Sequence, residues 1–326
     1  MTAIPVDVAD FVDTHELADA LRVLQERGPD VTVLAGGTDV MVQYLRGDIR
    51  PRILLHVRRL AELKGMEFGA RTTIGALTTH WELATDARVL RAHPALAEAA
   101  ATVGGRQTQN VGTIAGNVVN ASPAADLLPA LMVGDAVVEL TSAVGRRRLS
   151  ISDFIVGRRS TLRRPDELVT GFSLEPLPPT SAETYLKLGR RRAMEVAIVG
   201  LALRLAFEAD GRVTEARIAV CSVGPRPFRA RRAEEPLIGS RLEEDAIREA
   251  GERLCRAAAP IDDPRATAAY RRRVLRPLLE RAISTCRERW AASQDIEVEH
   301  GTSPAGQRGR ARSRRTSTPD PPGRAS

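Results

Sequence analysis

The sequence predicts an α+β chain of two domains, and three observations support this fold class. The chain is 326 residues long with 43% hydrophobic residues, enough for more than one hydrophobic core. Its first part alternates strand-like and helix-like segments around a glycine turn. After a boundary marked by Pro176, Pro178 and Pro179, a hairpin pattern and two long helical patterns follow.

Apolar spacing predicts the elements of the N-terminal domain. Asp13, with Glu16 three positions later, is a candidate N-cap for a helix that stops at Gly28-Pro29. A buried strand at 31–34 runs into the glycine turn, and a second helix should start near Asp39. The remaining predicted strands are 53–57, 73–77, 136–140, 148–151 and 168–174, and the remaining predicted helices are 81–84 and 95–103.

The C-terminal domain is predicted to be an antiparallel sheet plus helices. A strand at 184–188 precedes two strands, 196–207 and 213–220, which pair as a hairpin across Asp210-Gly211. Two helices, at 243–258 and 267–289, close the fold. After Trp290 the chain loses apolar residues and becomes rich in Arg, Ser, Gly and Pro, which predicts disorder. The predicted limits are 1–177 for the first domain, 181–289 for the second and 290–326 for the disordered tail.

The stretch from Gly104 to Leu131 is the most unusual part of the sequence. From Gln107 to Ala125 it has no charged residue, in a chain that is 27% charged. Its polar side chains exclude a membrane span, and it holds no helical or alternating pattern along its length. Glycine, small residues and short hydrogen-bonding side chains let a backbone lie against a large ligand. We therefore expect a binding loop.

The glycine turn at 35–39, with sequence AGGTD, is a weaker signal. A Gly-Gly pair at a strand end lets backbone N–H groups approach a phosphate, although a turn that merely needs positive φ would use the same residues. The sequence has neither a GxGxxG fingerprint nor a GxxxxGK[ST] loop.

Charge and cysteine content exclude several classes of function. The net charge is +7, but residues 301–326 hold six arginines against Asp320, so the first 300 residues carry only +2. With 3% aromatic residues and no groove-reading motif, the body argues against a nucleic-acid partner. Cys221, Cys255 and Cys286 have no ligand spacing, so no metal, iron–sulfur or disulfide site is expected. With no signal-peptide pattern and no membrane span, we expect a cytoplasmic protein.

Four motifs together resemble a known family. AGGTD, IGALTTH, VGTIAGNVVNASPAADLLPAL and YLKLGRRRAMEVAIVG occur in this order. They resemble the FAD-binding (medium) subunit of molybdenum hydroxylases of the xanthine dehydrogenase and carbon monoxide dehydrogenase type. The resemblance runs from about residue 4 to 286. It implies a two-subdomain FAD-binding domain with the p-cresol methylhydroxylase (PCMH) and vanillyl-alcohol oxidase fold, followed by a carbon monoxide dehydrogenase flavoprotein-like C-terminal domain.

The resemblance also implies which residues hold FAD. A first segment, residues 32–39, would wrap the pyrophosphate and ribitol, and a second segment, residues 113–117, would clamp the pyrophosphate side. Asp126 would accept a hydrogen bond from a flavin hydroxyl, and Val169 and Lys187 would line the ring. Ala115 stands where the family usually has a second glycine. The first segment is Thr32, Val33, Leu34, Ala35, Gly36, Gly37, Thr38 and Asp39, and the second is Thr113, Ile114, Ala115, Gly116 and Asn117. No catalytic residue and no metal ligand is implied in this chain.

Lys187 is also unusual by composition. The chain has 46 arginines and only two lysines, Lys64 and Lys187. In so Arg-biased a sequence, a lysine suggests a site where a compact ammonium suits better than a planar guanidinium, although chance is the alternative. A cation at the polar edge of the flavin would stabilise the anionic reduced ring.

The function implied is electron transfer within an oxidoreductase. Electrons would pass from [2Fe–2S] clusters on a small subunit through FAD on this chain to NAD or another acceptor, while a large molybdopterin subunit hydroxylates the substrate. The complex would be a dimer of heterotrimers. The lack of cluster-type cysteines fits this division and argues against the benzoyl-CoA reductase branch. Alternatives are a stand-alone flavin oxidase of the same fold, or a noncatalytic nucleotide- or polyanion-binding protein. The substrate and the final acceptor stay open.

Overall fold

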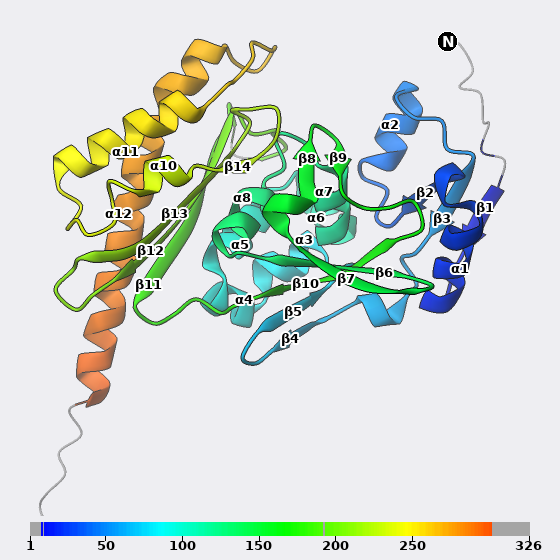
Figure 1. The fold of residues 1–326 in the computed structure, drawn as a ribbon, viewed down its shortest axis with the longest axis horizontal. Helices are drawn as coiled ribbons and strands as arrows, with labels where there is room; N and C mark the ends of the chain where they lie inside the picture. The colour runs from blue at the N-terminus through cyan, green and yellow to red at the C-terminus, as the bar shows by residue number, and fades with distance from the viewer. Residues whose placement is uncertain (1–7, 9, 192, 302–326) are drawn as a thin grey trace, which may run out of the picture.

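The computed structural model describes residues 8, 10–191 and 193–301. Three of the four sheets follow one another across the molecule (Figure 1): a small parallel sheet, a five-stranded antiparallel sheet with short helices above it, and a four-stranded antiparallel sheet backed by long helices. The fourth sheet is a separate pair of short strands, 155–157 and 160–161. The predicted α+β class is confirmed.

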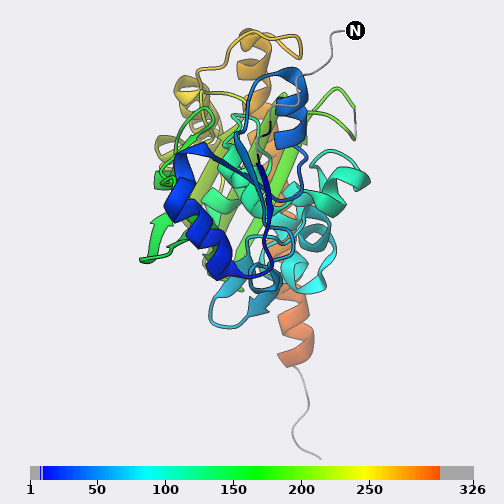
Figure 2. The same cartoon turned by 90° about the vertical axis from the view of Figure 1, so that its right-hand side faces the viewer.

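A three-stranded parallel sheet forms the N-terminal end, with strand order β1-β3-β2. Figure 2 faces this sheet, with α1 to one side of the strands and α2 at the top. Its elements are β1 (Asp10–Asp13), α1 (Leu17–Arg27), the 3-10 turn η1 (Gly28–Asp30), β2 (Val31–Leu34), α2 (Val40–Arg46) and β3 (Ile53–His56).

The predicted N-cap at Asp13 is wrong. Asp13 ends β1, and its carboxylate lies 2.8 Å from Nδ1 of His56 on the neighbouring strand. The helix begins at Leu17 after Glu16, with no side-chain cap. The pairing of β1 with β3 therefore determines where Asp13 points, although its spacing to Glu16 would suit a capping box.

The central sheet is antiparallel, in the order β4-β5-β10-β6-β7, and its strands come from distant parts of the first domain. The helices α3 and α5 pack beside it, and Leu96 and Phe172 are among the fully buried residues of the shared core. The elements are η2 (Ala61–Leu63), β4 (Met66–Phe68), β5 (Thr72–Gly75), α3 (His80–Thr85), α4 (Ala87–Ala92), α5 (Pro94–Ala101), β6 (Val137–Ser142), β7 (Gly145–Ser150), α9 (Ile151–Phe154), β8 (Ile155–Gly157), β9 (Ser160–Thr161) and β10 (Leu168–Leu174).

The stretch from Gly104 to Leu131, predicted as a binding loop without a regular pattern, contains two short helices and most of a third. They are α6 (Arg106–Val111), α7 (Ile114–Asn120) and α8 (Leu127–Val133). Each has only six or seven residues, too few to establish a helical period. All seven residues of α8 are buried, so this helix has no polar face that a sequence pattern could reveal.

The C-terminal sheet is buried on both faces. In β12, Ala202 faces α5 and α8 of the first domain, whereas Leu201 and Leu203 belong to the core beneath α11 and α12. The predicted hairpin of β12 and β13 is confirmed. The elements are β11 (Ser181–Leu188), β12 (Val199–Phe207), β13 (Val213–Cys221), β14 (Phe228–Arg229), α10 (Arg231–Glu234), α11 (Glu244–Ala257) and α12 (Ala268–Gly301).

The tail predicted from 290 does not begin there. The helix α12 continues to Gly301, and its final turns project beyond the sheet (Figure 1). Trp290 stacks on Phe207 with ring centroids 4.7 Å apart, so an aromatic contact holds the helix where the apolar pattern stops. The rest of the predicted tail, 302–326, lies outside the described residues.

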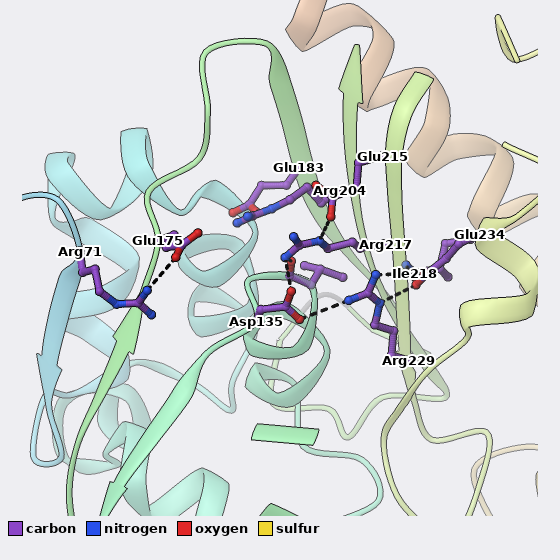
Figure 3. A network of polar contacts seen from close by, with 11 residues as sticks. Arg71, Asp135, Glu175, Glu183, Arg204, Glu215, Arg217, Ile218, Arg229 and Glu234 are labelled. Atoms are coloured by element: carbon purple, nitrogen blue, oxygen red, sulfur yellow. Dashed lines mark hydrogen bonds and ion pairs between the residues drawn. The ribbon is translucent and has the colours of Figure 1, made fainter. Parts of the chain in front are cut away.

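Ion pairs join the two domains (Figure 3). Asp135, which follows α8, pairs with Arg217 at 2.7 Å and with Arg229 at 3.2 Å, and both arginines lie on strands of the C-terminal sheet. Deeper in the interface, Glu183 accepts from Nε of Arg204 at 2.8 Å and from the backbone N–H of Ala95 at 3.2 Å. Glu183 and Arg204 are 2% and 4% exposed, so neither charge has water as an alternative partner.

This buried pair gives a stability prediction. Replacing Arg204 with methionine leaves the Glu183 carboxylate buried without its cation, which should cost about 3–5 kcal/mol in urea unfolding. The matched control is Arg148→Met, because Arg148 pairs with Glu139 at 3.0 Å but is 74% exposed. That change should cost less than about 1 kcal/mol. Equal losses in the two variants would contradict the assignment.

Candidate functional site

A cavity of about 320 Å³ lies between the parallel sheet, α2, α7 and the start of β10. It brings together most of the predicted cofactor residues: Thr32, Val33, Ala35, Gly36, Gly37, Thr38, Asp39, Thr113, Ala115, Gly116, Asn117 and Val169. The sequence did not single out its other lining residues, which are Val31, Val40, Gln43, Ile49, Val57, Leu63, Ala76, Leu77, His80, Val119, Asn120, Arg163 and Leu168.

The first predicted clamp segment touches the backbone just before the second. A Cβ atom on Gly36 would lie 1.8 Å from the carbonyl oxygen of Val111, two residues before the second segment begins at Thr113. No side chain fits in that space. Gly37 has φ +73°, a conformation that glycine adopts without strain. The glycine pair therefore serves both a close approach and a left-handed turn.

The IGALTTH segment holds the second clamp in place. The N–H of Ile114 donates to the carbonyl of Thr78 at 2.9 Å, and the N–H of His80 donates to the carbonyl of Gly112 at 3.1 Å. Thr113 and Thr79 form an isolated antiparallel bridge. Three motifs that are separated in the sequence thus meet around one cavity.

Thr113 begins α7 as a true N-cap. Its backbone is extended, at φ −115° and ψ 156°, and its hydroxyl accepts the N–H of Gly116 at 3.1 Å. Replacing such a cap usually costs about 1 kcal/mol. The cap fixes where the second clamp turns along the cavity wall.

Two polar atoms of the cavity wall are buried without a hydrogen-bond partner. These are Oδ1 of Asn117 and Nδ1 of His80. A buried polar atom left unpaired costs about 1–3 kcal/mol, so these two atoms are positions at which a bound ligand could supply the missing partner. Burial also lowers the pKa of His80 to about 4, which makes its imidazole neutral near pH 7.

A polar cluster closes the side of the cavity beneath α2. Gln43 donates to Oδ1 of Asn120 at 3.2 Å and accepts from Arg159 at 2.7 Å. Burial raises the pKa of the Asp39 carboxyl, while the charge of Arg159 and a hydrogen bond with Asn120 act against that rise. Asn120 follows the TIAGN motif by only three residues, so the motif could have indicated it, whereas no sequence signal points to Gln43 or Arg163.

Four predicted residues do not line this cavity. Leu34 lies in β2 and Ile114 is fully buried in the core. Asp126 and Lys187 instead form a buried ion pair of 2.9 Å, and Lys187 also donates to the carbonyl of Thr102 at 2.9 Å. The other oxygen of Asp126 accepts from the hydroxyl of Tyr185 at 2.7 Å.

Lys187 borders a second hollow, about 400 Å³, beside the segment Gly189–Glu195 that joins β11 to β12. Burial raises the pKa of Asp126, and the charge of Lys187 opposes that rise. Both carboxylate oxygens already have donors from the protein, so in this structure Asp126 holds Lys187 rather than presenting a free acceptor.

Comparison with known proteins identifies the family. The FAD binding domain in molybdopterin dehydrogenase matches residues 7–177, and the CO dehydrogenase flavoprotein C-terminal domain matches residues 184–286. The chain belongs to the FAD-binding subunits of molybdopterin dehydrogenases. It is therefore a component of an oxidoreductase and carries the domain that binds FAD, as the four motifs predicted.

The alignments with named relatives cover nearly the whole length of each relative. The xanthine dehydrogenase FAD-binding subunit of Escherichia coli O157:H7 is 30% identical over 281 residues, covering 84% of this chain and 96% of that protein. The carbon monoxide dehydrogenase medium chain of Afipia carboxidovorans is 29% identical, covering 86% and 97%. Among solved structures, carbon monoxide dehydrogenase from Hydrogenophaga pseudoflava superposes with a TM-score of 0.83 at 27% identity, covering 86% of this chain and 97% of that one.

Two further findings concern the rest of the described chain. Through residue 301 no helix is both long and apolar enough to cross a membrane. Across the same described residues, no group of three or more His, Cys, Asp or Glu side chains could hold a metal ion.

Two buried histidines predict how the stability of the cofactor-free chain depends on pH. Burial lowers the pKa of His80 to about 4, and burial together with the charge of Arg204 lowers that of His93 to about 4. The unfolded chain binds these protons from about pH 6.5 downward, so the stabilisation is present above pH 6.5 and is lost as pH falls toward 4.

Each histidine should therefore lower the free energy of unfolding by roughly 2 kcal/mol as the pH falls from 8 to 5, measured by urea titration. Because only His80 then contributes, the variant His93→Gln should lose about half as much unfolding free energy from these two groups over the same pH range. His15, which is exposed, gives the control His15→Gln, expected to leave the slope unchanged. An unchanged slope in His93→Gln would contradict a buried neutral imidazole.

Proposed function

We propose that this chain accepts electrons from [2Fe–2S] clusters of a small partner subunit and passes them through FAD to NAD or another acceptor. A large molybdopterin subunit would carry out substrate hydroxylation. The observation that carries this proposal is the cavity at which three family motifs meet, whose wall includes two buried polar atoms without a hydrogen-bond partner. The names of the relatives support it, since one is a subunit of a dehydrogenase complex and another a medium chain of carbon monoxide dehydrogenase.

The residues of the cavity fit FAD. Gly36, Gly37 and Thr38 offer a backbone turn and a hydroxyl to a diphosphate, and Asn117 offers an amide whose oxygen is unpaired. Apolar residues such as Val169 and Leu77 suit a flat ring system. When bound, FAD would supply the exchange of one or two electrons. The task of this chain is to bind the cofactor, exclude water from it and set its potential.

Lys187 would contribute to that potential through a charge held in place. Its side chain is 9% exposed, and its ammonium is fixed by Asp126 and the carbonyl of Thr102. Asp126 is in turn fixed by Tyr185, so we propose that Asp126 acts mainly by positioning Lys187. No residue of this chain needs to act as a general base.

We extend the proposal to the assembly and its location. The chain would work in a dimer of heterotrimers in the cytoplasm. Among the described residues all three cysteines are unpaired thiols, and Cys221 and Cys286 are buried, which supports a reducing compartment.

Replacing Asn117 with alanine tests whether the cavity binds FAD. The change removes an unpaired buried oxygen, so the apoprotein should keep its unfolding free energy, whereas its affinity for FAD should fall about tenfold. Fluorescence titration of the apoprotein with FAD measures the affinity. The matched control is Asn110→Ala, because Asn110 is exposed on α6 and should change neither quantity.

A wild-type protein that shows no flavin absorption after reconstitution would overturn the proposed function. Flavin absorption together with molybdenum and iron in the purified complex would support the heteromer. Flavin with substrate turnover but no metal would indicate a stand-alone oxidase.

The two lysines of the sequence allow a controlled test of flavin tuning. Lys187→Met should lower the two-electron midpoint potential of bound FAD by about 30 mV, equivalent to about 1.4 kcal/mol, because the reduced ring loses a nearby cation. Spectroelectrochemical titration measures it. Lys64→Met changes the net charge equally at an exposed site and should leave the potential unchanged. Identical potentials in both variants would show that Lys187 does not act on the flavin.

A further inference from the structure

Arg163 is the cationic residue of the cofactor cavity. Of the described residues that line this cavity, Arg163 alone carries a positive charge near neutral pH, because burial keeps His80 neutral there. It lies between the β8–β9 hairpin and β10, and its side chain is half-buried. Withdrawing a guanidinium from water is unfavourable unless an anion or hydrogen bonds compensate for the lost hydration.

The protein itself gives this guanidinium no carboxylate partner. No ion pair in the described part of the chain includes Arg163. The carboxylate of Glu167 accepts from Nη2 of Arg147 at 2.8 Å and from the backbone N–H of Arg164 at 2.7 Å. Burial lowers the pKa of Arg163, and the charges of Glu167 and Asp166 oppose that shift only in part.

The carboxylate of the cavity wall, Asp39, interacts with a different cation. The charge of Arg159 and a hydrogen bond with Asn120 lower the pKa of Asp39 against the effect of burial, and Arg163 contributes nothing to it. The acidic and the basic side chain of the wall therefore do not neutralise each other. The charge of Arg163 is left for an anion that the chain does not contain.

The turn that leads into β10 holds the guanidinium in place. Nη1 of Arg163 donates to the carbonyl of Arg164 at 3.0 Å and to the carbonyl of Glu167 at 2.7 Å. Both of its hydrogen bonds to the described residues use this one nitrogen, so Nε and Nη2 keep their donors for a ligand. A side chain that is already ordered loses less conformational entropy when a ligand binds.

A fixed guanidinium without a counter-ion suits a phosphate group. The diphosphate of FAD brings negative charge, and the two clamp segments, 32–39 and 113–117, contain no cationic side chain. Hydrogen bonds from arginine to phosphate are charge-assisted and roughly twice as strong as neutral ones. Adenine and oxidised flavin are uncharged rings, for which the apolar part of the wall is sufficient.

We propose that Arg163 binds the diphosphate of the cofactor and supplies the positive charge that the two clamp segments lack. The inference rests on the proposed function, because it names a residue through which that function would hold its cofactor.

Removing the charge tests the proposal. Arg163→Gln keeps amide donors for the two carbonyls, and Arg164→Gln is the matched control because Arg164 is exposed and does not line the cavity. Each apoprotein is titrated with FAD, and its melting temperature is measured without ligand. Arg163→Gln should keep the wild-type melting temperature but bind FAD at least about tenfold more weakly. Arg164→Gln should match the wild type in both measurements.

Restoring the charge separates electrostatics from packing. Arg163→Lys should bind FAD more tightly than Arg163→Gln but less tightly than the wild type, since an ammonium replaces the charge without the planar fork. This comparison also decides the case in which Arg163→Gln lowers the melting temperature. A stable Arg163→Lys that binds FAD no better than Arg163→Gln would overturn the role of the charge.

Failure of the inference differs from failure of the proposed function. Wild-type affinity for FAD in Arg163→Gln, or an equal loss in Arg164→Gln, would overturn the role of Arg163 while leaving the flavin function standing. A wild-type apoprotein that binds no FAD would overturn the proposed function itself.

Discussion

The cofactor cavity depends on one steric constraint, the contact between the Gly36 backbone and the carbonyl of Val111. Because a Cβ at Gly36 would lie 1.8 Å from that oxygen, any other residue would push the two clamp segments apart. The parallel sheet meets the body of the first domain at this cavity, so the constraint also fixes how that sheet is placed. The hydrogen bonds from Ile114 and His80 then align the second clamp against α3 and the turn that joins β5 to it.

The second requirement is that the C-terminal sheet be held firmly to the first domain. Tyr185 and Lys187 lie on β11, yet they bond to Asp126 at the start of α8. A shift of the sheet would therefore move the ammonium that we propose tunes the flavin. Gly200 on β12 leaves the space that Tyr185 occupies, since a Cβ there would lie 2.4 Å from its hydroxyl oxygen. Packing and electrostatics at this interface therefore act together to fix the position of Lys187.

Much of the fold could be predicted from the sequence, because strands such as 168–174 and the hairpin across Asp210-Gly211 have local apolar patterns that survive in the structure. The three short helices α6, α7 and α8 could not, since each has too few residues to establish a period and α8 is also buried on every side. The tail boundary failed for a related reason: the contact of Trp290 with Phe207 is tertiary and leaves no trace in composition.

The same contrast holds for the site. The glycine segments were accessible to motif reasoning, because close backbone approach restricts residue type. Gln43 and Arg163 were not, because a polar side chain on a helix or loop has no distinctive pattern. For Asp126 the motif located the residue, but its hydrogen bonds to Tyr185 and Lys187 depend on strand pairing that sequence reasoning could not place.

The position of α2 has an energetic consequence for cofactor binding. A seven-residue helix without a buried residue gains little stability from its own hydrogen bonds, so whatever packs on it determines how well it is ordered. FAD would contact the face that Val40 and Gln43 present to the cavity. Binding of FAD would then order this helix, and the conformational entropy lost in that ordering would reduce the net affinity for the cofactor.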